Sequence, residues 1–390
     1  MPEHQQNRKV QRLKPHRLGA LVVVAMALYS SAGSATEIEQ SMFSFSGFGT
    51  VGVTHSSEKN ADFVNSFFQP NGAGMSRSWS TDLDSRIGGQ VSANFNNQLS
   101  AVVQIIAEQQ WDNSYTPIVE WANVKYAITP DFSVRVGRIA LPTFLTSDSR
   151  KVGYTMPWVR PPLEVYQQLP VTKNDGVDAT YRFRIGNVSN SITGLAGKLN
   201  IMIPDGTPSG VFMKSKAMNI VDVIEYGALT LQAAYLHAKL TIPKVMDIPV
   251  PELSQVGDNA PFELMQAGVS YDPGNWFIMG ECAKSRFELT GNKFNWYVSS
   301  GWRLGKFTPY VTYAKLKQIT DPSPIPIALP AGQKSASIGL RWDAMKDISV
   351  KLQYDRINLD ENSVGSLIPG PSFQPGGKLN VVSAVVDFVF

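Results

Sequence analysis

The last ten residues of the chain, Val381-Val-Ser-Ala-Val-Val-Asp-Phe-Val-Phe390, show which kind of secondary structure dominates. Every second residue is apolar and falls on one face: Val382, Ala384, Val386, Phe388 and Phe390. Ser383 and Asp387 fall on the opposite face. Side chains of a β-strand point alternately to the two sides of a sheet, so this pattern predicts a strand with one strongly apolar face.

The same alternation recurs along the chain after residue 35. In residues 84–95, for example, Arg86 and Gln90 oppose Ile87 and Val91. Strand signals of this kind predict about 16 segments. Their spans are 43–54, 84–96, 98–109, 117–129, 131–138, 176–186, 188–200, 218–226, 228–240, 264–273, 275–286, 292–302, 306–315, 334–343, 347–357 and 378–390.

The connections between these segments alternate in length. Those on one side are tight turns, such as Asn96-Asn97, Gly186-Asn187 and Leu304-Gly305. Those on the other side are mostly long, at residues 55–83, 139–175, 201–217, 241–263, 316–333 and 358–377. This asymmetry is typical of a transmembrane antiparallel β-barrel with short periplasmic turns and long extracellular loops. The sequence therefore predicts an all-β fold of about 16 strands.

A soluble β-sandwich is the alternative, because one face of each of its sheets is also solvated. Many segments here run for about 10–12 residues, which suits a tilted membrane strand better than a soluble strand of about 5–6. A closed barrel also removes the edges that long strands would otherwise expose. Aromatic residues lie near segment ends, as membrane-interface girdles require: Phe43, Phe95, Trp121, Phe132, Trp276, Trp302, Trp342 and Phe390.

Residues 1–35 form a region of a different kind. Basic residues up to Arg17 precede an apolar run at 18–28, and small residues follow up to Ala35. This is the tripartite pattern of a secretory signal peptide, cleaved after Ala35. The alternative is a transmembrane anchor, but about 11 apolar residues span only about 17 Å as a helix. We therefore expect an exported protein whose mature part, residues 36–390, is one barrel in the outer membrane.

The net charge of +3 comes from this leader. The chain has 35 basic and 32 acidic residues, of which the leader holds five and one, so residues 36–390 carry 30 basic against 31 acidic residues. Without an excess of positive charge in residues 36–390, nucleic-acid binding is not expected. Cys282 is the single cysteine, so no disulfide forms within the chain.

The leader, the amphipathic segments and the terminal aromatic residue together resemble a general outer-membrane porin of Gram-negative bacteria, a family of trimeric barrels of roughly 16 strands. The resemblance covers residues 36–390. It implies a homotrimeric, water-filled channel for ions and small hydrophilic solutes, set among outer-membrane lipids and lipopolysaccharide. It also implies that Phe388 and Phe390 belong to the signal read by the barrel-assembly machinery. Neither a cofactor nor an enzymatic activity is expected.

The longest connection, residues 139–175, lies between the fifth and sixth segments, where porins of this family have their constriction loop. Loops longer than about 12–15 residues are usually functional or disordered. The aromatic and proline content of this loop favours a packed loop that folds into the lumen. A loop that lies on the outer surface is the alternative.

The family narrows its pore with loop carboxylates that face basic residues on the barrel wall, and such opposed charges create a transverse field. The matching acidic candidates are Asp148, Glu164, Asp175 and Asp178. The basic candidates at inward-facing positions are Arg86, Lys125, Arg135, Arg182 and Arg184. The loop departs from the family pattern because it also carries Arg150, Lys151 and Arg160 and lacks the acidic Pro-Glu-Phe-Gly-Gly stretch of the enteric members. Ion preference is therefore open, and a neutral or mildly anion-preferring pore is an alternative to a cation-selective one.

A match to a dinucleotide motif also occurs, in Gly47-Phe-Gly-Thr-Val-Gly52. That motif requires a helix after the glycines, whereas here a strand continues into a polar loop. The glycines more simply permit curvature or close packing within the first strand.

Histidines and carboxylates near the loops suggest two further sites. A barrel-anchored enzyme could use His55 beside Ser56, or His237, but the chain contains no G-x-S-x-G elbow. Asp82 and Asp84 could bind Ca²⁺ together with loop oxygens, and a solvated acidic strand end is the alternative. A site of the zinc type is not indicated, because the chain contains neither His-x-x-His nor a cysteine cluster. The alternatives that stay open beside a diffusion porin are a substrate-specific outer-membrane channel and a barrel that displays an enzyme or adhesin.

Overall fold

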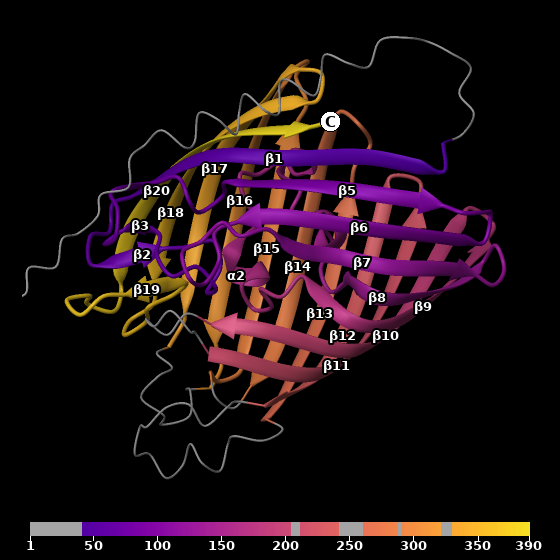
Figure 1. The fold of residues 1–390 in the computed structure, drawn as a ribbon. Helices are drawn as coiled ribbons and strands as arrows, with labels where there is room; N and C mark the ends of the chain where they lie inside the picture. Colours follow the sequence, from indigo (N-terminus) through magenta and orange to yellow (C-terminus); the bar gives the residue numbers. More distant parts are fainter. Residues whose placement is uncertain (1–40, 204–210, 242–259, 288–289, 321–329) are drawn as a thin grey trace, which may run out of the picture. The chain divides into compact units, whose positions relative to one another are not determined.

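Sixteen long antiparallel strands form a closed barrel wall in the computed structural model, which describes residues 41–203, 211–241, 260–287, 290–320 and 330–390 (Figure 1). Each strand pairs with its neighbour in sequence, and β1 pairs with both β5 and β20, which closes the sheet. The wall strands are β1 (Phe43–Ser56), β5 (Arg86–Asn94), β6 (Leu99–Glu108), β7 (Ile118–Ala127), β8 (Phe132–Ala140), β9 (Lys173–Ile185), β10 (Val188–Ile203), β11 (Val211–Tyr226), β12 (Leu229–Thr241), β13 (Ala260–Tyr271), β14 (Trp276–Phe287), β15 (Lys293–Trp302), β16 (Phe307–Gln318), β17 (Gln333–Met345), β18 (Ile348–Leu359) and β20 (Gly377–Val389).

The predicted all-β barrel is thus confirmed, and each predicted segment overlaps one wall strand. The largest error is at β11, which begins at Val211 whereas the prediction began at residue 218. Exposed Lys214 and Lys216 occupy the outward-facing positions there, so that part of the strand lacks the apolar alternation that marks the others. The predicted signal peptide, residues 1–35, lies outside the described residues.

The two faces of the wall differ as the alternation predicts. In β18, Ser349, Lys351 and Gln353 are buried inside the barrel, whereas Leu352 and Tyr354 point outward and are 54% and 42% exposed. Residues of the outward face carry the apolar side chains because a membrane strand meets lipid on that side.

Aromatic rings collect on the outward face near the short turns. Tyr271 lies 5.5 Å from Trp276, and Trp276 stacks on Trp302 with 6.4 Å between ring centroids. Phe307 stacks on Trp342 at 6.1 Å. Such rings form the girdle that a barrel places at a membrane interface.

Small elements lie in the loops at the opposite end. β2 (Ala61–Phe63) pairs with β3 (Ala73–Gly74) and with β19 (Leu367–Pro369), and β4 (Trp79–Ser80) pairs with β1. The segment between β8 and β9 contains the short helices η3 (Ser147–Ser149), η4 (Gly153–Thr155) and α2 (Leu163–Tyr166). None of the helices in the described ranges is long and apolar enough to cross a lipid bilayer.

The glycines of the G-x-G-x-x-G match lie at the seam between the first and last strands. The rings of Phe390 and Phe388 lie where a Cβ would project from Gly47 and Gly49. Backbone hydrogen bonds join Phe390 to Gly47 in both directions, at 2.7 and 3.0 Å. These two glycines therefore serve close packing of the terminal aromatic rings, and a strand follows them instead of a helix.

The segment from 141 to 172 packs against the inside of the wall. Leu141, Phe144, Trp158 and Tyr166 are buried in one apolar cluster. The wall supplies inward-facing residues of β10–β16 to the same cluster, among them Leu195, Leu199, Leu236, Ala238, Leu264, Phe277, Tyr297 and Tyr310. Burial of this much apolar surface holds the segment against one half of the wall.

Replacing Gly153 with valine should destabilise the barrel by about 1–3 kcal/mol, the usual cost of overpacking. A Cβ at Gly153 would overlap the Asp387 carboxylate and lie 2.7 Å from Thr50 Oγ1. The midpoint of urea unfolding in lipid vesicles measures the effect. Gly194→Val is the control, because a Cβ there meets nothing within 4 Å, and equal midpoints for the two variants would contradict the packing.

Candidate functional site

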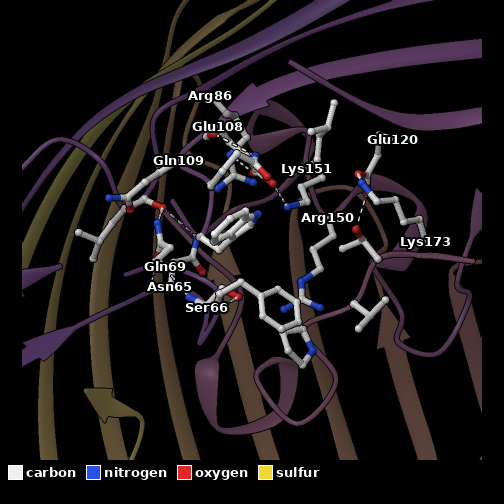
Figure 2. A pocket seen from close by; sticks show the side chains of 18 of the residues that line it. Asn65, Ser66, Gln69, Arg86, Glu108, Gln109, Glu120, Arg150, Lys151 and Lys173 are labelled. Atoms are coloured by element: carbon white, nitrogen blue, oxygen red, sulfur yellow. Dashed lines mark hydrogen bonds and ion pairs between the residues drawn. The ribbon is translucent and has the colours of Figure 1, made fainter. Parts of the chain in front are cut away.

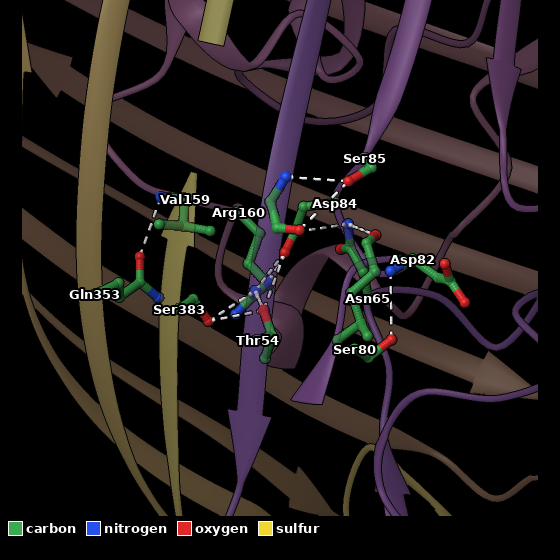
Figure 3. A network of polar contacts seen from close by, with 12 residues as sticks. Thr54, Asn65, Ser80, Asp82, Asp84, Ser85, Val159, Arg160, Gln353 and Ser383 are labelled. Carbon is green, nitrogen blue, oxygen red and sulfur yellow. Dashed lines mark hydrogen bonds and ion pairs between the residues drawn. The ribbon is translucent and has the colours of Figure 1, made fainter. Parts of the chain in front are cut away.

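Three groups of polar contacts join the segment 141–172 to the wall. The first is centred on Arg160, which is buried (Figure 3). Its guanidinium donates to Asp84 at 2.5 and 3.1 Å, to Thr54 at 2.9 Å and to Ser383 at 2.9 Å. Asp355 lies 3.8 Å away on the other side. Arg160 thereby connects the segment to β1, β18 and β20 and to the loop that precedes β5.

The second group is centred on Lys351 of β18. Its Nζ donates to the carbonyls of Gly153 and Trp158 at 2.7 and 2.9 Å and pairs with Asp387 at 2.9 Å. Arg341 of β17 donates to the carbonyls of Tyr154 and Met156 in the same way, at 2.6 and 3.0 Å. These contacts fix the backbone of the segment over residues 153–158.

The third group is centred on Glu281 of β14. Its carboxylate accepts hydrogen bonds from the Tyr166 hydroxyl at 2.5 Å, the Tyr297 hydroxyl at 2.8 Å, the Leu145 amide at 3.0 Å and the Gln266 amide at 2.7 Å. These three groups therefore anchor the segment to β14, β17, β18, β20 and β1.

Two cavities lie between the segment and the wall, the upper one mainly against β5–β11 and the lower one against β7–β12. The upper cavity, near the loops, has a volume of about 350 Å³ and is lined by Arg86, Glu108, Arg150 and Lys151 among others. The lower cavity, nearer the short turns, has about 270 Å³ and is lined by Lys125, Arg135, Asp148 and Arg182 among others. Consecutive residues of the segment line the two cavities: Ser147, Asp148 and Ser149 the lower one, and Arg150 and Lys151 the upper one.

Basic side chains outnumber acidic ones around both cavities. In the lower cavity Arg135 forms a bidentate pair with Asp178 at 2.5–3.1 Å. Lys125 and Arg182 form no ion pair among the described residues, and Asp148 is the remaining carboxylate. In the upper cavity Lys151 pairs with Glu108, and Lys173 pairs with Glu120 at 2.9 Å.

The structure brings most of the predicted site residues together. Arg86 lines the upper cavity, and Lys125, Arg135, Arg182 and Asp148 line the lower one. Asp178 adjoins the lower cavity through Arg135. Asp175 forms an ion pair with Arg138 at 2.6 Å and accepts a hydrogen bond from Asn200.

Two predicted residues lie elsewhere. Arg184 lies near the turn at Gly186, is exposed and donates to Ser189 at 3.3 Å, because lumen-facing parity continues to the end of the strand, beyond the cavities. Glu164 is buried on the far side of the segment, where it accepts a hydrogen bond from Gln333 at 2.8 Å. Burial raises the pKa of Glu164. Its hydrogen bond to Gln333 of β17 makes this carboxyl an anchor of the segment.

Glu108, Arg150 and Lys151 complete the upper cavity. Glu108 ends β6 at the same parity as buried Gln104 and Ile106, so a count of inward-facing positions could have found it. Arg150 and Lys151 follow η3 in an irregular segment. No periodicity tells which way such side chains point, so only the fold places them.

The residues weighed for catalysis and metal binding have other partners. His55 faces outward and stacks on Trp79 at 4.7 Å, whereas Ser56 is buried on the inward face. His237 lies on the outer face, 3.8 Å from Glu263. The Asp82 carboxylate pairs with Arg77, and Asp84 pairs with Arg160. In the described part of the chain no group of three potential metal ligands occurs.

The architecture is that of a porin-type barrel, and comparison with solved structures supports this. An anion-selective porin from Comamonas acidovorans is 12% identical, with a TM-score of 0.56 over 89% of this chain and 99% of that one. OmpF of Salmonella typhi, in complex with daunomycin, is 14% identical, with a TM-score of 0.54 over 91% and 100%. OmpT of Vibrio cholerae, an outer membrane protein described in a trimer form, is 12% identical, with a TM-score of 0.53 over 89% and 99%.

At these identities the similarity establishes the fold, which is that of the 16-stranded porins. No protein-family model matches the chain, and no curated protein sequence matches it either.

Proposed function

We propose that this chain is an outer-membrane porin, a water-filled channel through which ions and small hydrophilic solutes diffuse passively. The observation that carries the proposal is the pair of polar, charge-lined cavities inside a closed barrel, one on each side of residues 147–151. A barrel of this size with polar residues on its inner face can enclose a water-filled lumen. The segment 141–172 would be the constriction loop and would narrow the channel against β5–β12.

The proposed channel prefers anions. Lys125 and Arg182 below residues 147–151, and Arg86 and Arg150 above them, exceed the carboxylates available to pair with them. Fixed charges of one sign in a narrow, low-dielectric passage raise the local concentration of the opposite ion. The anion-selective porin among the structural neighbours is consistent with this preference.

A cysteine introduced at residue 149 tests whether ions pass through the two cavities on either side of residues 147–151. The variant Ser149→Cys/Cys282→Ser carries one thiol, on the segment between the two cavities. A negatively charged, bulky thiol reagent should lower its single-channel conductance in a planar bilayer, since the added group would stand between the two cavities, at the proposed constriction. Asn187→Cys/Cys282→Ser, modified at a short turn, is the control. Equal conductance of both variants after modification would contradict the proposed route.

The basic residues on the outer surface of the barrel support the proposal that the barrel lies among anionic lipids. Lysines and arginines occupy outward-facing positions near the loop ends of β10–β20: Lys198, Lys214, Lys216, Lys239, Lys284, Arg286, Lys315, Lys317, Lys334, Arg356 and Lys378. Lys216 lies directly opposite Lys239, and Lys315 opposite Lys334. Like charges in these positions repel, and phosphate groups of outer-leaflet lipopolysaccharide would relieve that repulsion.

Removing four of these charges should reduce the thermal stabilisation of the barrel by lipopolysaccharide. The variant Lys216→Gln/Lys239→Gln/Lys315→Gln/Lys334→Gln should gain less thermal stability than the wild-type chain when lipopolysaccharide is added to detergent micelles, because bound ligand stabilises only the folded state. Lys306→Gln/Lys346→Gln, at the opposite end of the barrel, is the control. The same gain in melting temperature for wild type and the fourfold variant would exclude this lipid surface.

The proposed assembly is a homotrimer. On β1, β5 and β6 the outward face near the loops lacks lysine and arginine and presents Val53, Ile87 and Ile105. A face without the lysines suits contact with a second copy better than contact with lipid phosphates. Phe388 and Phe390, stacked at 6.4 Å on the outer face of the last strand, suit the proposed assembly signal.

A further inference from the structure

Arg150 is a cation of the upper cavity that no carboxylate neutralises. Its guanidinium donates to the backbone carbonyls of Leu169 at 2.9 Å and Tyr166 at 2.8 Å and lies over the Tyr166 ring. It forms no ion pair among the described residues. Burial lowers the pKa of Arg150 to about 10, so it remains charged at neutral pH. The carbonyl bonds hold the group at the wall of the cavity while its charge stays unpaired.

Two further cations stand beside it and share one carboxylate. Lys151 Nζ lies 2.5 Å from Glu108, and Arg86 Nε lies 4.0 Å from the other oxygen of the same group. Figure 2 shows Arg86 and Lys151 on either side of Glu108, with Arg150 next to them. Three positive charges therefore meet one negative charge, which leaves two in excess.

The rest of the cavity supplies apolar surface. Phe68, Trp111 and Ile118 line it together with Val171. A volume of about 350 Å³ falls in the range of small-molecule sites, which combine apolar walls with a few polar groups that fix orientation. An inorganic anion would use the charges and leave the apolar wall without a partner.

We propose that the upper cavity is a saturable binding site for small organic oxyanions that carry an apolar ring. Arg86, Arg150 and Lys151 bind the carboxylate or phosphate group, and Trp111 and Phe68 pack against the ring. This inference rests on the proposed channel function, because a solute would enter the cavity on its way through the barrel. It makes the channel selective for a class of solute, beyond simple diffusion.

Equilibrium dialysis of radiolabelled benzoate against the full chain in detergent tests the site without requiring a current. We expect saturable binding that unlabelled benzoate and phenyl phosphate displace, each at a lower concentration than acetate. Benzamide, which has the same ring without the charge, should not displace it. Phenyl phosphate stronger than benzoate would mark a phosphate site, and the reverse order a carboxylate site.

Arg86→Gln is the informative variant, because it removes a charge and leaves the hydrogen bonds of Arg150 in place. Loss of one charge-assisted contact should weaken benzoate binding about tenfold. Arg184→Gln, outside both cavities, should bind as the wild-type chain does. Trp111→Leu should weaken benzoate binding and leave the weak acetate binding unchanged.

Channel current separates failure of the site from failure of the channel. Single-channel current in KCl without saturable benzoate binding would overturn the site and leave the porin proposal standing. Saturable binding without current would overturn the porin proposal and leave the site. Benzoate binding of equal strength in wild type and Arg86→Gln would also overturn the site, since binding would then occur elsewhere.

Discussion

Replacing Arg160 with methionine should lower the free energy of unfolding by about 3–5 kcal/mol, the cost of breaking a buried ion pair by removing one partner. Asp84 and Asp355 are both buried beside it, so the variant leaves two carboxylates without their cation. Methionine keeps much of the side-chain volume, so the loss of charge dominates. Urea unfolding in lipid vesicles, followed by tryptophan fluorescence, measures the difference.

Arg184→Met is the matched control, because Arg184 is exposed at a short turn and makes no ion pair within the described residues. Its unfolding midpoint should stay close to that of the wild-type chain. The Arg160→Met channel should also fluctuate between more conductance levels, since the segment 141–172 loses its link to β1 and β20. An unchanged midpoint for Arg160→Met would mean that this pair does not hold the segment.

Reversing the charges of Lys125 and Arg182 together should turn an anion-preferring channel into a cation-preferring one. Both line the lower cavity without a paired carboxylate, and with the Arg135–Asp178 pair neutral they exceed Asp148 by one charge. In Lys125→Glu/Arg182→Glu the same space holds three negative charges in excess. Because fields in such clefts change local ion concentrations by about tenfold or more, the anion-to-cation permeability ratio should fall by about that factor.

Arg184→Glu/Lys306→Glu changes the net charge of the chain by the same amount at positions outside the cavities. Reversal potentials under a salt gradient compare the two variants with the wild-type chain. A shift of equal size in both variants would mean that the overall field of the barrel, and not the lower cavity, sets the ion preference.

The fold was predictable because the side chains of a barrel strand alternate between the inside and the outside of the barrel, and this alternation appears in the sequence with a period of two residues. In β18, for example, the inward-facing residues from Ser349 to Asp355 are polar and the outward-facing residues between them are Val350, Leu352 and Tyr354, and the turns mark the strand ends. The same alternation places four basic residues on the inner face of the wall, and all four line a cavity: Arg86 the upper one and Lys125, Arg135 and Arg182 the lower one. Where lysines replace apolar residues on the outer face, as at Lys214 and Lys216 of β11, the strand signal fades.

The segment between β8 and β9 was predictable only in outline. Its length and aromatic content indicate a packed loop, but an irregular chain has no period from which side-chain directions follow. The sequence therefore groups Glu164 with the pore carboxylates, whereas in the structure it accepts a hydrogen bond from Gln333 on the far side of the segment. The partners of Arg160 come from β1, β18, β20 and the loop before β5, so only tertiary structure could identify them.

The porin proposal is best tested by the single-channel conductance and reversal potential of the refolded wild-type chain in a planar bilayer under a KCl gradient. We expect stepwise openings and a reversal potential whose sign shows that chloride permeates better than potassium. A correctly folded barrel that passes no current would contradict the porin proposal. Open channels with a potassium-preferring reversal potential would contradict the role given to Lys125, Arg182 and the cations of the upper cavity.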